Sequence, residues 1–245
     1  MSEIVVEDIS KRFGGLQALS GVSFPLRTGE VRAVIGPNGA GKSTLINCLT
    51  GAVIMDTGRL VIDGHPVAGN FSERLVDAGI TRTFQNVRLF NSLTALEHLM
   101  LARRSYERSR RFRPGRGDAR TVCRTLLDRV GLAAKAGKRP AELAYGERRR
   151  LEIARGLAIE PILFLVDEPA AGSTGTEQMT LATLLSGIAA DGAAVVLVEH
   201  HMDMIGRVAN AVTVLNFGRV IAEGTFADIK RDPAVIAAYL GTQAE

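Results

Sequence analysis

Short apolar runs alternate with helical patterns along this chain. Residues 31–35, 162–166 and 195–199 are rich in Val, Leu and Ile without polar alternation, which is typical of strands covered on both faces. A helix is expected between the last two runs, over about residues 177–190. This order of strands and helices predicts an α/β fold with a mostly parallel core sheet.

Other short segments predict antiparallel strands at the edges of the fold. Residues 4–6 and 22–24 are strand-like, and residues 59–67 contain the Asp63-Gly64 pair that marks a two-residue hairpin turn. A further hairpin is expected within residues 212–222.

A block of helices is expected between residues 94 and 158. Thr94 begins the first helix, because Glu97 stands three residues later and completes a capping box. Further helices are predicted over residues 121–130 and 146–158. Within the last helix, the arginines at 148–150 are expected to be partly exposed charges.

The composition agrees with one globular domain. Of the 245 residues, 46% are hydrophobic and 23% are charged, which excludes a disordered chain, a collagen-like chain and a disulfide-framed mini-protein. The apolar runs are far shorter than the ~18–20 residues that cross a bilayer. Residues 1–8 lack the basic start of a secretory signal, so we expect a cytosolic chain. Cys48 and Cys123 lack metal-ligand spacing and are expected in the core.

The positive charge is concentrated in one segment. Thirty Lys and Arg residues against 26 Asp and Glu residues give a net charge of only +4, but nine arginines lie close together. Such a run can face nucleic acid or an anionic membrane, although a solvated helix face or loop is the commoner case. The nine are Arg103, Arg104, Arg108, Arg110, Arg111, Arg113, Arg116, Arg120 and Arg124.

A phosphate-binding loop follows the first core strand. It fits the pattern G-x-x-x-x-G-K-[ST] and lies between a predicted strand and a helical pattern, as this motif requires. Its glycines let backbone N–H groups turn towards phosphates, and the next helix N-terminus favours an anion. Lys42 supplies a charge for the β- and γ-phosphates of ATP, and the Ser43 hydroxyl can bind Mg²⁺. The predicted nucleotide-binding residues here are Gly36, Pro37, Asn38, Gly39, Ala40, Gly41, Lys42, Ser43 and Thr44.

Two carboxylates follow the second core strand. Asp167 and Glu168 come directly after residues 162–166, and ligands bind at the carboxyl ends of strands in open α/β sheets. One carboxylate can hold the Mg²⁺ shell while the next orients and deprotonates a water. Together with the phosphate loop, this pair indicates ATP hydrolysis.

Further features resemble the ABC ATPases. Residues 143–147, Leu-Ala-Tyr-Gly-Glu, resemble the signature segment of that family. Gln85 and His200 stand where the family has its Q-loop glutamine and switch histidine, and Phe13 matches the aromatic residue that stacks on adenine. With the phosphate loop and the Asp-Glu pair in the same order, the resemblance covers nearly the whole chain.

The resemblance implies a P-loop NTPase fold of the ABC cassette type, in one domain over residues 1–245. Residues 1–85 and 159–245 would form a RecA-like core with an antiparallel β subdomain at its edge. Residues 86–158 would form an inserted helical subdomain that carries the signature segment.

The resemblance also implies roles and partners. Glu168 would be the general base, His200 would hold the γ-phosphate and the attacking water, and Gln85 would join Ser43 and Asp167 around Mg²⁺. Two ATPase chains would close head to tail, each placing its signature on the ATP of the other. The signature residues expected at that nucleotide are Ala144, Tyr145, Gly146 and Glu147.

Three segments are similar to the G-type ATPase subunit of branched-chain amino acid importers. They are residues 12–19, 81–90 and 235–241. That resemblance implies a peripheral subunit on the cytoplasmic face of the inner membrane, a different second ATPase subunit, two membrane permeases and a periplasmic binding protein. Urea, amide and aromatic-acid importers share the family and remain alternatives for the solute.

Two readings of another class stay open beside this one. A soluble ABC protein could use the arginine-rich segment on nucleic acid, but such proteins usually carry two cassettes or a long coiled coil. A binding module with a decayed ATPase is disfavoured by the intact Lys42, Asp167, Glu168 and His200. We therefore expect the arginines near the membrane surface and no nucleic-acid partner.

The chain departs from the family pattern at positions that serve the partner's ATP site. Ala144 replaces the usual signature serine, and Glu147 replaces glutamine. Residues 172–174, Gly-Ser-Thr, replace the usual Gly-Leu-Asn or Ala-Leu-Asp after the catalytic pair. These changes predict a heterodimer with two unequal ATP sites.

Overall fold

Two β-sheets organise the fold, which a computed structural model describes for residues 1–67, 75–85, 87–113 and 117–240. The larger sheet has the strand order β10-β9-β3-β8-β7-β6. Five of its strands run parallel, and β10 pairs antiparallel with β9 at one edge. Its strands are β3 (Val31–Ile35), β6 (Ile80–Arg82), β7 (Leu163–Asp167), β8 (Ala194–Val198), β9 (Ala211–Asn216) and β10 (Arg219–Gly224).

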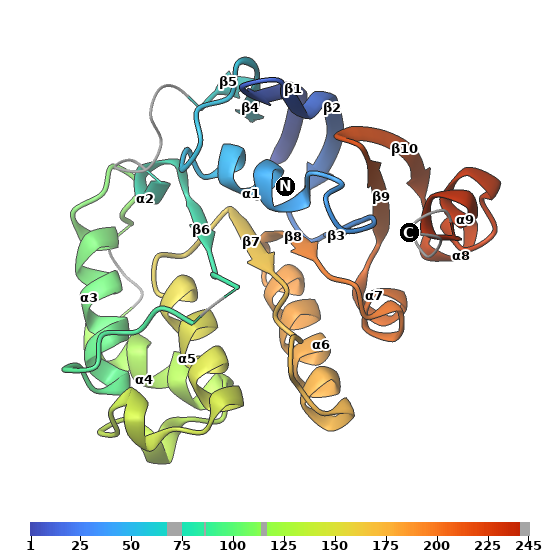
Figure 1. The fold of residues 1–245 in the computed structure, drawn as a ribbon. Coiled ribbons are helices and arrows are strands. Elements are labelled where there is room, and N and C mark those ends of the chain that lie inside the picture. Colours follow the sequence, from blue (N-terminus) through green and yellow to red (C-terminus); the bar gives the residue numbers. More distant parts are fainter. Residues whose placement is uncertain (68–74, 86, 114–116, 241–245) are drawn as a thin grey trace.

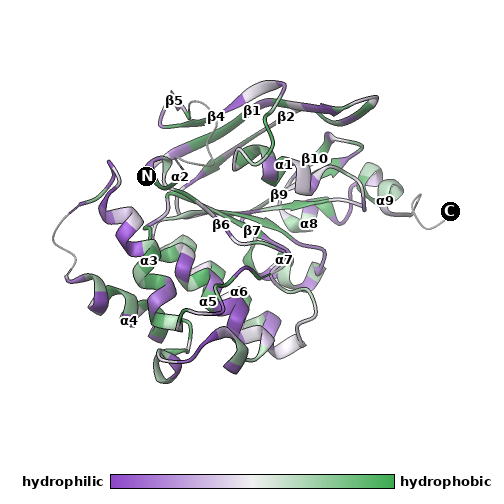
Figure 2. Cartoon of the chain, turned by 60° about the vertical axis from the view of Figure 1, so that its left-hand side comes forward, coloured by the Kyte–Doolittle hydropathy of each residue, from purple (hydrophilic) through white to green (hydrophobic). Residues whose placement is uncertain are grey.

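The smaller sheet is antiparallel and lies across helix α1 (Lys42–Leu49) from the larger one (Figure 2). Its order is β2-β1-β4-β5, formed by β1 (Glu3–Phe13), β2 (Leu16–Arg27), β4 (Thr57–Ile62) and β5 (His65–Pro66). Asp63 and Gly64 both have positive φ, 50° and 75°, which is the backbone of the predicted two-residue hairpin turn.

The other face of the larger sheet carries helices, and a block of them stands beside the β6 edge (Figure 1). Helices α5, α6 and α7 contribute to one apolar core with this face, together with α3 and α4. The helices are α2 (Leu75–Ala78), α3 (Ala95–Glu107), α4 (Ala119–Arg129), α5 (Tyr145–Leu157), α6 (Gly175–Ala190), α7 (Met202–Val208), α8 (Phe226–Ile229) and α9 (Pro233–Leu240). Two short 3₁₀ turns, Ala133–Lys135 and Pro140–Glu142, connect α4 to α5.

The uninterrupted apolar strands are explained by this layering. In β7, Leu163 and Leu165 pack towards α1 and the antiparallel sheet, whereas Phe164 and Val166 pack into the helical layer. Both faces of the strand are buried from water, so apolar side chains are favoured on both. The predicted parallel core and antiparallel edges are confirmed.

Side-chain caps set the helix starts. The capping box of Thr94 and Glu97 is present at α3, as predicted. Helix α4 begins at Ala119, two residues before the predicted start, because the Asp118 carboxylate accepts from two first-turn N–H groups. Helix α6 begins at Gly175 because Thr174 and Glu177 form another capping box.

Several expectations stand outside what the structure describes. Asn86, residues 114–116, with Arg116 among them, and Gly241 are not in the described ranges. The division at residues 86 and 158 stays a prediction. Within the described part of the chain, no helix is both long enough and apolar enough to span a bilayer.

Candidate functional site

Parallel pairing gathers the chemistry-bearing residues at one edge of the larger sheet. Strands β3, β6, β7 and β8 run in the same direction, so their carboxyl ends meet there. The phosphate-loop residues, Gln85, Glu168 and His200 all follow these ends within a few residues. This is the crevice in which open α/β sheets bind their ligands.

The phosphate loop joins β3 to α1, and at two of its glycines the backbone leaves no space for a side chain. Gly41 is the N-cap of α1 in the left-handed region, with φ 104°. A Cβ added there would lie 2.6 Å from the carbonyl oxygen of Ala18, and one added at Gly36 would lie 2.1 Å from that of Leu215. The backbone therefore approaches its neighbours too closely for any side chain.

The start of α1, like the starts of α5 and α7, has no side-chain cap. Gly41 offers no side chain, and no acidic residue stands in the first turn, whereas α3, α4, α6 and α8 are capped by Thr or Asp. The first N–H groups of α1 are thus left to an anion, which the helix dipole also favours. A nucleotide phosphate fits this cradle.

Lys42 completes the cradle. Its Nζ donates to the carbonyl oxygens of Gly36 and Pro37 at 2.6 and 2.9 Å, which holds the ammonium group over the loop. Burial lowers the pKa of Lys42, while the charges of Glu168 and Asp167 act in the opposite direction. The charges of both carboxylates therefore act on the Lys42 ammonium group.

The two carboxylates at the end of β7 face different partners. The buried Asp167 accepts from Nη2 of Arg82 at 3.0 Å, and Arg82 also donates to Oδ1 of Asn47 in α1 at 2.6 Å. Glu168 has a left-handed backbone, with φ 44°, and its Oε2 accepts from Nε2 of Gln85 at 2.8 Å. The structure brings Gln85 and Glu168 together.

The donor set suits a magnesium ion. Ser43 offers a hydroxyl, Gln85 an amide oxygen and Asp167 a carboxylate, which are the hard oxygen ligands that Mg²⁺ prefers. Ser43 lies exposed at the start of α1, directly after Lys42, and Asp167 has its second carboxylate oxygen beside the one that Arg82 holds. These residues fit the ion in the type of ligand atom that they offer.

His200 follows β8 and has a half-exposed ring at the same edge. Its ring lies 4.2 Å from that of His201, centroid to centroid. Within the described ranges, no hydrogen bond joins His200 to Lys42 or Glu168. The backbone N–H of His200 donates to Glu199, and its ring Nδ1 lies 3.8 Å from Oε2 of the same carboxylate. Phe13 lies at the end of β1, also half-exposed, with Lys11 Nζ 5.4 Å from the ring centroid.

Glu199 was not anticipated from the sequence, and it connects two segments of the site. Its buried carboxylate accepts from the N–H groups of Ala170 and His200, each at 2.8 Å, and from Nδ1 of His201 at 2.7 Å. Burial raises the pKa of Glu199, but these hydrogen bonds outweigh it and the pKa lies below its ordinary value. The ionised group ties the loop after Glu168 to the switch position. The sequence signal that could have identified Glu199 is its position as an acidic residue directly after the buried apolar strand β8.

The signature residues are not beside the phosphate loop of their own chain. Ala144 is the N-cap of α5 and has no side-chain cap to offer, while Glu147 accepts from the Ala144 N–H at 3.0 Å. A Cβ at Gly146 would lie 2.7 Å from a carboxylate oxygen of Glu177 in α6. In the described residues no hydrogen bond or ion pair joins residues 143–147 to residues 36–44.

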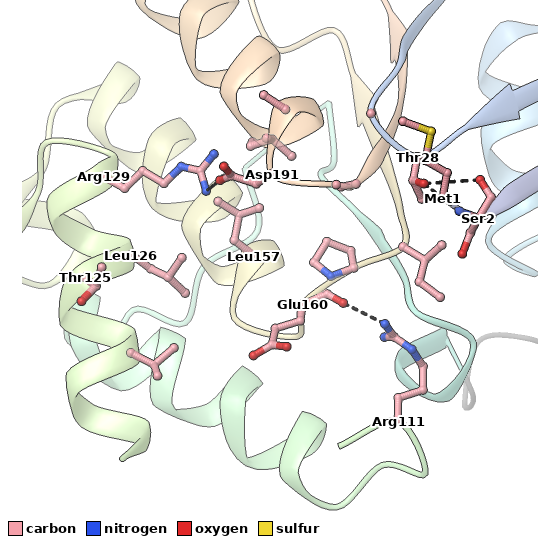
Figure 3. Close-up of a pocket in the computed structure, with 18 of the residues that line it drawn as sticks. Met1, Ser2, Thr28, Arg111, Thr125, Leu126, Arg129, Leu157, Glu160 and Asp191 are labelled. Atoms are coloured by element: carbon pink, nitrogen blue, oxygen red, sulfur yellow. Dashed lines mark hydrogen bonds and ion pairs between the residues drawn. The ribbon is translucent and has the colours of Figure 1, made fainter. Parts of the chain in front are cut away.

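A cavity of about 910 Å³ lies at the opposite ends of the strands (Figure 3). Thr28, Ile162 and Ala193 line it from the sheet side, and Thr125 and Leu126 line it from α4. None of the predicted site residues contributes to its wall. The cavity is therefore separate from the phosphate cradle.

Comparison with known families decides the class. A family model described as ABC transporter matches residues 19–171, which is more than half of the chain. The chain belongs to this family. A second model, described as branched-chain amino acid ATP-binding cassette transporter, matches residues 219–245 of this ABC transporter cassette.

Named relatives span the cassette nearly end to end. The high-affinity branched-chain amino acid transport ATP-binding protein LivG of Salmonella typhimurium is 36% identical over 248 residues, covering 97% of each chain. BraF of Pseudomonas aeruginosa, with the same description, is 37% identical over 246 residues and 96% of each chain.

Solved structures agree with the fold. The crystal structure of an ATP-binding cassette of an ABC transporter in its ADP conformation has a TM-score of 0.87 and 29% identity over 98% of this chain and 99% of its own. A dimeric bacterial ABC transporter cassette has a TM-score of 0.78 and 25% identity over 91% and 98%.

Two expectations about arginines are corrected. Arg149 of the cassette is not a partly exposed helix charge, because it is only 1% exposed and donates into the site. Arg103 of the arginine-rich segment is also 1% exposed, and its Nη1 pairs with Oε1 of Glu160 at 2.7 Å. Arg111 donates to the Glu160 carbonyl, visible in Figure 3. Part of the arginine-rich segment is therefore internal structure.

Proposed function

We propose that this ABC transporter cassette is an ATP-hydrolysing subunit that energises the import of branched-chain amino acids through a membrane transporter. The observation that carries the choice of solute class is the match of residues 219–245 to the branched-chain amino acid cassette model. The similarity to LivG and BraF over the whole chain supports it.

Hydrolysis would use residues that the strand ends gather. Lys42 and the first N–H groups of α1 would hold the β- and γ-phosphates, and the Phe13 ring would stack on the adenine. A water would attack the γ-phosphorus, the bond to the bridging oxygen would break, and the water's proton would pass to Glu168. Mg²⁺ held by Ser43, Asp167 and Gln85 would offset charge on the phosphate oxygens.

The contact between Gln85 and Glu168 supports this assignment. A hydrogen bond of 2.8 Å from the Gln85 amide holds the Glu168 carboxylate at the carboxyl ends of the parallel strands, where a water attacking the γ-phosphate would stand. His200 would bind the γ-phosphate from the end of β8. The half-exposed ring of His200 supports this role, because it is open to solvent.

We propose further that two cassettes close head to tail. Among the described residues, no hydrogen bond or ion pair joins the signature residues Ala144, Tyr145, Gly146 and Glu147 to their own phosphate loop, which supports a role for them at the ATP site of another chain. The solved dimeric cassette of similar fold agrees with it. The departures at Ala144, Glu147 and residues 172–174 favour a different second subunit and two unequal ATP sites.

The remaining partners follow from import. Two integral-membrane permeases would carry the solute, and a periplasmic binding protein would deliver it, so the cassette would bind peripherally to the cytoplasmic face of the inner membrane. The helical block beside β6 would face the permeases. The half-exposed Phe90 and Leu101 on this block are apolar groups available for such a contact.

Reconstitution tests the proposal. The cassette, its partner ATPase and both permeases would be placed in proteoliposomes, with ATP inside and the solute-loaded binding protein outside. Leucine, isoleucine and valine should each raise ATP hydrolysis and accumulate inside. Stimulation by urea, a short amide or an aromatic acid, without stimulation by these amino acids, would reject the solute class. An absence of ATP hydrolysis with every solute would reject the enzymatic role.

A further inference from the structure

Helix α5 directs two charged side chains into the molecule. Arg149 and Glu152 stand three residues apart, which places them on the same helix face. Both residues are 1% exposed. Fully buried charges are uncommon and need specific partners.

Arg149 donates to three backbone carbonyls that belong to the ATP site. Its Nη1 donates to Phe84, and its Nη2 donates to Gln85 at 2.8 Å and to Glu168 at 3.1 Å. One guanidinium group therefore bridges the segment after β6 and the residue after β7. The planar fork of arginine provides this geometry, which a lysine ammonium cannot reproduce.

Glu152 holds the same segment by accepting hydrogen bonds from backbone N–H groups of that segment. Its Oε1 accepts from the backbone N–H groups of Phe84 and Arg88, each at 3.3 Å. Arg155, on the next turn, donates to the Arg88 carbonyl at 2.6 Å. The backbone around Gln85 leaves the edge strand β6 and is held by side chains of α5, which satisfy its polar groups.

The stability of the fold alone does not explain this buried charged pair. Arg149 Nε is buried and has no hydrogen-bond partner among the described residues, and the same holds for Oε2 of Glu152. Nη1 of Arg149 lies 3.5 Å from Oε2 of Glu152, so attraction between the two charges offsets part of the cost of burying them. Well-packed apolar residues often replace such pairs at no loss of stability.

We propose that Arg149 is a positioning residue that couples helix α5 to Gln85 and Glu168. The inference rests on the proposed ATPase function. Because α5 begins at the signature residues, a movement of α5 produced by nucleotide in one ATP site displaces Gln85 and Glu168 in the other. The two ATP sites of a cassette dimer thus communicate within a single chain, through Arg149 and with Glu152 holding the same segment.

The test compares Arg149→Lys with Arg27→Lys in the assembled transporter. Arg27 lies at the end of β2, is exposed, stands outside the helical block and the ATP site, and serves as the matched control. Arg149→Lys should leave the KM for ATP within about threefold and lower kcat by about 10- to 100-fold, because misplacement of a catalytic group by ~1 Å costs up to ~10²-fold. Arg27→Lys should change neither constant. An unchanged kcat in Arg149→Lys would overturn the proposal.

Two readouts separate positioning from a structural role. Amide hydrogen exchange of residues 84–88 should accelerate in Arg149→Lys, while exchange in β3 and α1 stays as in the parent. In a Glu168→Gln background, Arg149→Lys should cause no further loss of kcat, because residues that act as a unit are not additive. Equal losses in both backgrounds, with a matching fall in thermal stability, would overturn the proposal.

Glu152→Gln provides a second variant should Arg149→Lys fail to fold. It retains the shape and one acceptor oxygen, so we expect a smaller loss of kcat and the same local rise in exchange at residues 84–88. No rise in exchange would overturn the proposal. A parent transporter without ATP hydrolysis would instead reject the proposed function. The exchange of the parent cassette, compared with that of the variant, would still show whether Arg149 and Glu152 hold the backbone around Gln85.

Discussion

The side-chain amide of Gln85 donates to the carboxylate of Glu168, with Nε2 and Oε2 2.8 Å apart. These residues are far apart in sequence, but they follow β6 and β7, which pair in parallel. The strand register therefore brings a polar amide beside the proposed base. The arrangement has direct consequences for substitutions at this site.

Glu168→Gln should remove the base while it preserves the contact with Gln85. A glutamine at this position still offers an oxygen to the Gln85 amide, so the loop geometry and the affinity for ATP should stay close to those of the parent. Turnover should fall by about 10²–10⁴, the usual contribution of a general base. Turnover and ATP binding in the assembled transporter test this. Hydrolysis at close to the parent rate would reject Glu168 as the base.

Lys42→Ala should act on nucleotide binding itself. The ammonium group is held over the phosphate loop by two carbonyls, and its removal deletes a charged hydrogen bond worth ~1.5–3 kcal/mol. ATP affinity should fall by roughly 10- to 150-fold. Lys230→Ala, at an exposed position beside α8, is the control. Equal affinities for both variants in a titration with ATP would exclude Lys42 from the site.

Ala144→Ser should separate the two unequal ATP sites. Serine at this N-cap could reach the partner's γ-phosphate, and the regained hydrogen bond predicts roughly 10- to 150-fold faster turnover at the weaker site. It would also cap α5, which stabilises a helix by ~0.5–2 kcal/mol. Single-turnover kinetics and a melting curve measure the two effects independently. Higher stability without faster turnover would mean that Ala144 is catalytically neutral.

Glu199 should make the stability of the chain depend on acid. Because hydrogen bonds hold its folded-state pKa below the ordinary value of 4.5, ionised Glu199 adds to the free energy of unfolding above that pH. The contribution is lost as the pH falls through the folded-state pKa. Urea unfolding from about pH 7 to about pH 4 should show a shallower loss for Glu199→Gln than for the parent. Identical slopes would show that His200, His201 and the Ala170 N–H do not stabilise the charge.

The two cysteines should be inert in the folded chain. Both side chains are fully buried, and burial raises the pKa of Cys48 and of Cys123 to about 11. A thiol reagent at about pH 8 should therefore react with neither until the chain is unfolded in denaturant. Rapid labelling of one thiol under native conditions would reveal an opening of the core around that residue.

The sequence by itself determined the elements whose causes are local. The phosphate loop, the capping box of Thr94 and Glu97 and the hairpin at Asp63-Gly64 each depend on a few adjacent residues, and all appear where they were expected. The apolar runs of β7 and β8 indicated a sheet covered on both faces, because a strand with no solvent-exposed face has no alternating polar positions. Family motifs extended this to the order of the site residues.

Only the tertiary structure decided which charged residues are internal. Arg149 and Glu152 look like the polar face of an amphipathic helix, yet the backbone that leaves β6 has no further strand to pair with and takes its partners from them. Glu199 is likewise fixed by N–H groups from a loop after another strand. Periodicity reports where a helix has charges, whereas their burial depends on unpaired backbone groups that distant segments bring to them.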